Sequence, residues 1–114
     1  MPDLPITSIV AGTKSITINS SANPITVQAA VPGKRFVVLY LLMKSAGTTT
    51  LGLNSGGTEI SGGNLVASES LEMGGHGVPV LVGVGVNEAF TIDNSGTVLL
   101  EGTALVGLVD TVVT

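Results

Sequence analysis

The longest uninterrupted apolar segment of the chain spans residues 36–43, between Lys34-Arg35 and Lys44. It is too short to cross a bilayer as a helix, and its β-branched and aromatic residues are typical of a strand. Because no polar residue alternates with the apolar ones, both faces of this strand need cover. A second sheet of the same chain, or another copy of the chain, would supply that cover.

Two segments before this strand alternate polar and apolar residues, as half-buried strands do. They are residues 15–19 and 25–28, and residues 19–24 between them are rich in turn-forming types. This pattern predicts a hairpin. Residues 48–53 follow the central apolar strand after a loop of small residues, so we predict a second hairpin there.

The second half of the chain continues the β pattern. Residues 58–60 lie between two glycine-rich turns and suit a short edge strand, which limits unwanted pairing. Residues 65–73 fit a single helical turn or an irregular strand, and we favour the strand. Residues 80–86 and 90–92 resume β character. Residues 97–113 are rich in Val, Leu and Thr, which predicts a strand in the middle of a sheet.

Together these segments predict an all-β fold, a single-domain antiparallel sandwich or jelly roll of about eight strands. A length of 114 residues fits one domain. We place an extended N-terminal arm at residues 1–10 and the jelly-roll sandwich at residues 11–114. Pro2 and Pro5 bias the arm to an extended backbone, and a disordered terminus is the alternative.

The composition indicates more apolar surface than one small soluble domain needs. Hydrophobic residues make up 44% of the chain and charged residues 11%, against about 25% charged in typical proteins, and the mean hydropathy is +0.61. No apolar stretch reaches the roughly 18 residues of a membrane span, and the N-terminus lacks a signal-peptide pattern. We therefore expect no membrane partner, and we expect another protein chain to cover the excess apolar surface.

The few charged residues are unevenly distributed. All four basic residues precede residue 45, seven of the eight acidic residues follow it, and the net charge is −4. This distribution argues against a nucleic-acid partner, which requires a clustered basic surface. It fits either a basic protein surface as partner or a role in solubility alone.

Side chains for catalysis or metal binding are scarce. The chain has no cysteine and a single histidine, His76, so we expect no cofactor and no metal site within one chain. Three copies around an axis could still bring three imidazoles to one ion. Glu69 and Glu72 could form the carboxylate pair of a glycosidase, but the chain has no Trp to hold a sugar ring. We read both glutamates as solvated and expect no enzyme activity.

Five short motifs follow one another along the chain. Residues 34–39 read Lys-Arg-Phe-Val-Val-Leu, residues 45–50 Ser-Ala-Gly-Thr-Thr-Thr, and residues 55–62 Ser-Gly-Gly-Thr-Glu-Ile-Ser-Gly. Residues 87–92 read Asn-Glu-Ala-Phe-Thr-Ile, and residues 102–106 Gly-Thr-Ala-Leu-Val. This order resembles that in a group of small structural proteins of tailed phages. The chain lacks the aromatic residues that the group often carries after its Gly-His turn and in its C-terminal strand.

The resemblance implies a jelly roll that assembles as a homotrimer on the virion. We expect a capsid decoration (cement) protein that binds the major capsid protein on the outer surface of the capsid and stabilises the head. A trimeric tail-fibre or receptor-binding head domain is the alternative. The expected capsid-binding arm consists of Met1, Pro2, Asp3, Leu4, Pro5 and Ile6. The residues expected in the core or at the trimer contact are Phe36, Val38, Tyr40 and Leu42.

Overall fold

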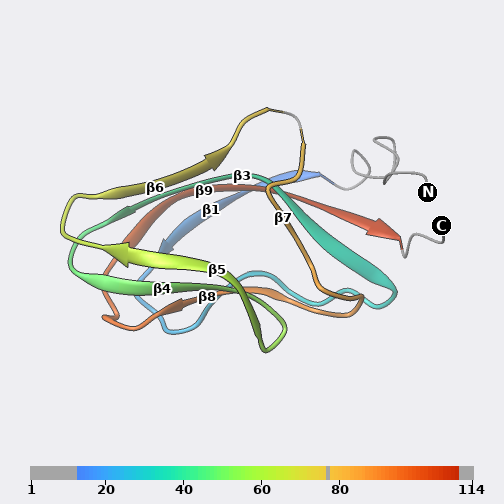
Figure 1. Ribbon diagram of the computed structural model, residues 1–114, viewed down its shortest axis with the longest axis horizontal. Helices are drawn as coiled ribbons and strands as arrows, with labels where there is room; N and C mark the ends of the chain where they lie inside the picture. The colour runs from blue at the N-terminus through green and yellow to red at the C-terminus, as the bar shows by residue number, and fades with distance from the viewer. Residues whose placement is uncertain (1–12, 77, 111–114) are drawn as a thin grey trace.

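The computed structural model describes residues 13–76 and 78–110, which form nine β-strands and no helix (Figure 1). In this part of the chain there is accordingly no helix that could cross a membrane. The all-β prediction is confirmed, with one short strand more than the eight expected. The strands are β1 (Lys14–Ser20), β2 (Ile25–Gln28), β3 (Lys34–Ser45), β4 (Thr49–Ser55), β5 (Thr58–Leu65), β6 (Ser70–Gly74), β7 (Leu81–Val82), β8 (Phe90–Asn94) and β9 (Leu100–Asp110).

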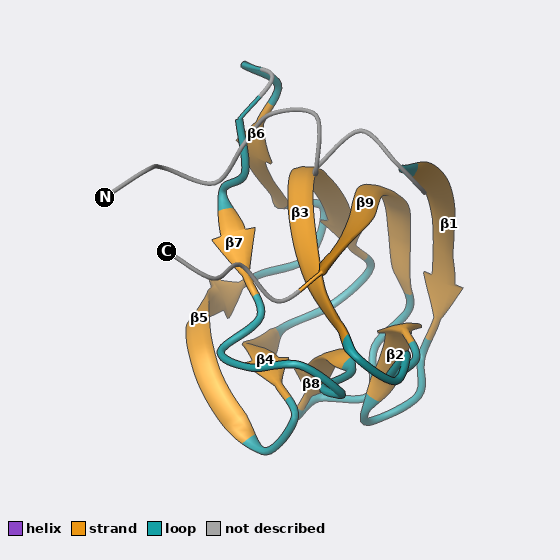
Figure 2. Cartoon of the chain, turned by 90° about the vertical axis from the view of Figure 1, so that its right-hand side faces the viewer, coloured by secondary structure: helices purple, strands orange, loops and turns teal. Residues whose placement is uncertain are grey.

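The strands form two antiparallel sheets that pack face to face (Figures 1 and 2). The first sheet has the order β1-β9-β3-β6, with β7 pairing to β3 beside β6, and the second has the order β2-β8-β4-β5. The pairing is nested, because β1 pairs with β9, β2 with β8, β3 with β6, and β4 with β5. Nested pairs distributed over two sheets make this sandwich a jelly roll.

Both predicted hairpins are wrong. β1 and β2 lie in different sheets, and so do β3 and β4. The turn residues between them do reverse the chain, but a turn specifies only where the chain reverses. Each strand turns apolar side chains toward the core, and the two members of each predicted pair pack across the core instead of pairing side by side.

Three strand assignments differ in extent from the sequence prediction. The edge strand expected at residues 58–60 is β5, which has eight residues and does lie at the edge of the second sheet. The segment at residues 65–73 divides into a turn and β6, and only Leu81–Val82 of residues 80–86 form a strand. The closing strand β9 lies between β1 and β3, which confirms its predicted place inside a sheet.

The core lies between the two sheets and joins residues distant in sequence. Phe36 of β3 stacks on Phe90 of β8, with ring centroids 5.2 Å apart and ring planes at 24°. Contacts of this kind bind the layers together, because each sheet buries only its inner face. The fully buried apolar side chains of this core are Phe36, Val38, Leu41, Met43, Leu53, Phe90, Ile92, Leu100, Ala104 and Val106, whereas Val37 and Val109 are buried in a separate cluster with Leu39.

A β-bulge at Leu39 changes which residues of β3 face the core. Val38 pairs with Val106 of β9 and Tyr40 pairs with Leu105, so the register shifts by one residue between them. As a result, the core-facing positions are the even-numbered Phe36 and Val38 before the bulge and the odd-numbered Leu41 and Met43 after it.

Candidate interaction surfaces

The outer face of the first sheet changes from charged to apolar along the strands. At one end, Asn19, Glu101 and Lys44 lie opposite one another on β1, β9 and β3. The next outward-facing row, from β1 to β6, is Thr17, Thr103, Leu42 and Glu72. Charged residues thus mark this end of the face, and at the other end of the sheet Lys34 and Arg35 of β3 pair with Asp110 and Val109 of β9.

Apolar side chains occupy the other half of the same face. Leu105 and Tyr40 lie opposite each other one row beyond Leu42, and Leu39 packs against the buried Val37 and Val109. We call Leu39, Tyr40, Leu42 and Leu105 the apolar patch. All four side chains of the patch are partly exposed.

A hydrogen bond holds Tyr40 in place at the border of the apolar patch. The Tyr40 hydroxyl donates to Glu72 Oε2 at 2.6 Å. This bond, with partial desolvation and the nearby Glu72 charge, raises the pKa of Tyr40 above its ordinary value. The ring also lies beside Gly75, where a Cβ would come within 3.7 Å of it. That distance is an ordinary van der Waals contact, and it is the backbone φ of +92° that favours glycine at this position.

The structure separates the four predicted core or trimer residues into two pairs. Phe36 and Val38 are in the core, whereas Tyr40 and Leu42 lie on the outer face within the apolar patch. The sequence lacked any signal for this division, because a bulge of one apolar residue inside an apolar run leaves no trace in its pattern. The expected capsid-binding arm, residues 1–6, lies outside the described residues.

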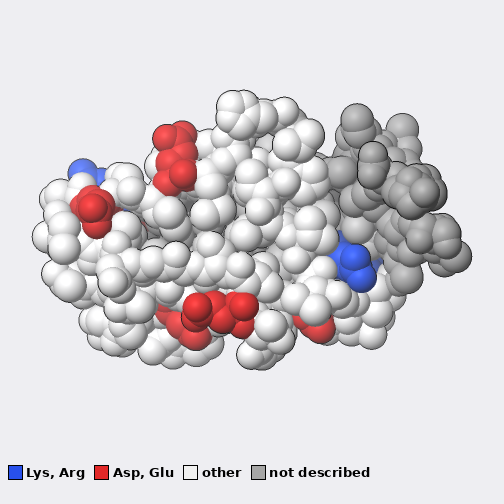
Figure 3. Space-filling model, viewed as in Figure 1, with Lys and Arg blue, Asp and Glu red and all other residues white. Residues whose placement is uncertain are grey.

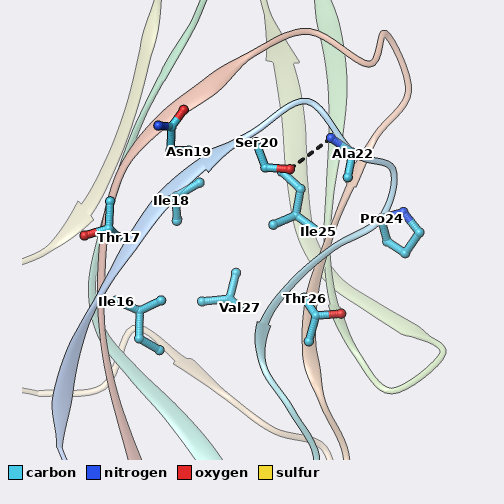
Figure 4. A pocket seen from close by; sticks show the side chains of 10 residues that line it. All are labelled: Ile16, Thr17, Ile18, Asn19, Ser20, Ala22, Pro24, Ile25, Thr26 and Val27. Atoms are coloured by element: carbon cyan, nitrogen blue, oxygen red, sulfur yellow. Dashed lines mark hydrogen bonds between the residues drawn. The ribbon is translucent and has the colours of Figure 1, made fainter.

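A groove of about 280 Å³ opens between β1 and β2, which are the edge strands of the two sheets on the same side of the sandwich (Figure 4). Ile16 and Ile18 from β1 and Ile25 and Val27 from β2 point into the space between the strands. At one end, Ser20 Oγ accepts a hydrogen bond of 3.0 Å from the Ala22 N–H. The lining contains no charged residue.

The outer face of the second sheet is acidic. In the view of Figure 3, the largest group of acidic atoms lies on the lower layer, which is the second sheet, and smaller groups lie on the upper layer. There Glu59 of β5 and Asp93 of β8 both lie over Gly52, where a Cβ would be 2.7 Å from a Glu59 oxygen and 3.3 Å from an Asp93 oxygen. Carboxylates at this surface favour contact with water.

Potential ligand and catalytic residues are dispersed in the described part of the chain. His76 is exposed in the loop after β6, and no group of three or more His, Cys, Asp or Glu side chains placed to hold an ion occurs among the described residues. Glu69 Oε1 accepts a hydrogen bond of 3.0 Å from the Val66 N–H in the turn before β6. Glu72 instead accepts from Tyr40, so the two glutamates have different structural partners.

Sequence reasoning missed a buried polar network around Asn94, whose side chain has no exposed surface. Asn94 Oδ1 accepts a hydrogen bond of 2.7 Å from Thr49 Oγ1, and its Nδ2 donates to the carbonyl oxygens of Val98 at 2.8 Å and Ala22 at 3.3 Å. The Asn94 N–H donates to Asn23 Oδ1 at 3.0 Å. One side chain thus connects three segments at one end of the sandwich. The sequence signal at residues 93–96 indicated only a turn.

No protein-family model, curated protein or solved structure matches the chain. An assignment of function must therefore account for the jelly roll, the apolar patch and the groove.

Proposed function

We propose that the protein is a bacteriophage capsid decoration protein, which binds the outer surface of the capsid as a homotrimer and stabilises the head. The apolar patch of Leu39, Tyr40, Leu42 and Leu105 is the observation that carries this proposal. The solvent face of an antiparallel sheet normally bears polar side chains, and a contiguous apolar area there marks a contact with another molecule.

The occupant that the patch fits best is a second copy of the chain. Among the described side chains, Glu72 is the one carboxylate at the border of the patch, and that group already bonds the Tyr40 hydroxyl. A standard interface buries about 800 Å² per partner and is depleted in charge at its centre. Three copies that share an axis through this patch would remove its apolar side chains from water.

Two further features support a role on the shell. The order of motifs between residues 34 and 106 resembles that in small structural proteins of tailed phages, which implies the same jelly roll and trimeric assembly. The acidic second sheet suits the side of a trimer that stays in contact with water. Residues 1–6, with two prolines, are our candidate for the segment that binds the major capsid protein, because prolines reduce the entropy lost on binding.

Sedimentation of the purified chain, with and without undecorated phage shells, tests this proposal. We expect a trimer at micromolar concentration that binds shells saturably. Removal of residues 1–6 should abolish shell binding and leave the trimer intact. A stable monomer, or a trimer that binds host cells and not shells, would overturn the proposal, the latter in favour of the tail-fibre or receptor-binding alternative.

A matched pair of substitutions tests whether the apolar patch forms the trimer contact. Leu42→Asp places a charge inside the patch and should convert the trimer to monomers, because the carboxylate would be buried without a partner. Asn64→Asp adds the same charge to the exposed surface of β5 and should leave the trimer unchanged. Equal behaviour of the two variants would show that another surface joins the subunits.

A further inference from the structure

The two sides of the sandwich differ in how their strand edges are protected. On one side, the edge strands β5 and β6 carry Glu59 and Glu72. Charged side chains on an edge discourage strand addition, because an incoming strand would desolvate them. On the other side, β1 has one charge, at its first residue Lys14, and β2 has none. Residues 15–33 contain no ionisable side chain at all.

The edge of β1 also forms one side of the groove. Among the described strands, β1 pairs with β9 alone and β2 with β8 alone. A strand added beside β1 would extend the first sheet over Ile16, Ile18, Ile25 and Val27 and would close the groove. The neutral lining calls for an uncharged strand.

The chain contains an uncharged segment of strand-forming residues just before β1. Residues 7–10 read Thr-Ser-Ile-Val, and three of the four are β-branched. Residues 4–13 carry no charge. Residues 7–10 are tethered to the start of β1 at Lys14 by only three others, residues 11–13.

This short tether argues against closure of the groove by the same copy. To run back along its own β1, the chain would have to reverse within residues 11–13, and residue 7 would then pair no further along than Thr17. The half of the groove beside Ile18, Asn19 and Ser20 would fall to residues 1–6, where Pro2 and Pro5 have no N–H to donate. A second copy has no such restriction and can lay residues 7–10 along Ile16–Ser20.

The tether also restricts how the copies meet. Residues 10 to 14 span at most about 14 Å, at roughly 3.5 Å per residue. The start of β1 in the donor copy must therefore lie within that distance of the groove in the acceptor. The apolar patch lies at the same end of the first sheet, because Leu105 pairs with Ser15 near the start of β1. Contact through the patch would bring the β1 ends of neighbouring copies together.

We infer that residues 7–10 of one copy add as a strand to the edge of β1 in the next copy and close the groove between β1 and β2. This inference rests on the proposed trimer and names its interlocking element. Each copy donates one segment and accepts one, so the donor and acceptor surfaces differ and three copies complete a ring.

Cysteine cross-linking gives a direct test, because the chain has no cysteine of its own. Chains with Ser8→Cys and chains with Asn19→Cys are refolded together and oxidised mildly. Disulfides require Cα atoms within about 7 Å, so a linked pair of chains on a non-reducing gel is the expected result. A chain with both substitutions should give covalent trimers. The pair Ser8→Cys and Asn64→Cys, with Asn64 on β5 across the sandwich, is the control and should not link.

Proline substitutions test the same strand pairing even if the two cysteines do not lie opposite each other. Adjacent N–H groups of a strand point to opposite sides, so either Ser8→Pro or Ile9→Pro removes a donor to β1. One of the two should weaken trimer association about tenfold or more, whereas Asp3→Pro should not. Links only within single chains, equal linking to Asn64→Cys, or trimers unaffected by both prolines would overturn strand exchange.

The outcomes separate this inference from the proposed function. Trimers that cross-link as expected but ignore phage shells would refute the decoration role and leave strand exchange intact. If the Ser8→Pro and Ile9→Pro variants both form normal trimers that bind shells, strand exchange is refuted and the decoration role stays intact.

Discussion

Asn94 shows how one residue can hold an end of the sandwich together. Its side chain is fully buried and bonds Thr49, Val98 and Ala22, which belong to three separate segments. Asn94→Ala leaves the Thr49 hydroxyl and two carbonyl oxygens without this partner, so we expect a loss of about 3 kcal/mol in the free energy of unfolding, measured by urea denaturation. Asn64 makes a similar bond of 2.9 Å with Thr50 Oγ1 but is exposed. Asn64→Ala should change stability by less than about 0.5 kcal/mol.

Tyr40 offers a second prediction at the residue scale. It is the only tyrosine in a chain without Trp, so its ionisation can be followed by near-UV absorbance. The hydrogen bond to Glu72 raises its pKa above the ordinary value of 10.0, and Glu72→Gln should lower the pKa toward that value. Folding favours the neutral phenol, so this contribution to stability is present below pH 10.0 and is lost as pH rises through the raised pKa. Glu69→Gln should leave the titration unchanged.

At the scale of elements, the bulge in β3 determines whether an Asp introduced into this strand unfolds the domain or only weakens the trimer. Leu41 is fully buried in the core, whereas Leu39 lies on the outer face against Val37 and Val109. A typical domain is stabilised by only about 5–15 kcal/mol, and a buried carboxylate without a partner costs more than this. The Leu41→Asp variant should therefore be unfolded. Leu39→Asp should remain folded and weaken the trimer. Far-ultraviolet circular dichroism and sedimentation measure the two effects, and a folded Leu41→Asp would contradict the register of β3.

At the scale of the whole molecule, the proposed assembly joins apolar surfaces and leaves the acidic second sheet in water. Trimer association should therefore change less than about threefold between about 0.1 M and about 1 M salt, although the screening length falls from about 10 Å to about 3 Å. Sedimentation equilibrium across this range provides the measurement. Dissociation at high salt would indicate that ion pairs, and not the apolar patch, hold the subunits together.

The sequence predicted where the strands lie along the chain better than it predicted which strands pair with each other. The Val, Leu and Thr content of residues 97–113 correctly placed β9 inside a sheet, because a strand with two neighbours and a covered face needs such residues. The turns at residues 19–24 and 45–48 suggested hairpins that the fold does not contain. A turn signal is local, whereas the choice of sheet depends on which faces meet across the core.

The candidate surfaces depended still more on the tertiary structure. The apolar run at residues 36–43 predicted a strand that needs cover on both faces, but the bulge at Leu39 determined that Tyr40 and Leu42 face outward. The groove arises because β1 and β2, predicted as partners, instead lie at the edges of opposite sheets. A uniform apolar pattern carries no information on either point.

The amino-acid order alone therefore determined the all-β class, the main strand positions, the scarcity of catalytic groups and the excess of apolar surface, because these follow from local alternation and composition. Only the tertiary structure decided the nested pairing, the outward half of β3, the Asn94 network and the uncharged edge beside the groove. Those features depend on contacts between residues far apart in the chain, such as Val38 with Val106 and Thr49 with Asn94. Such contacts form only when the two sheets come together.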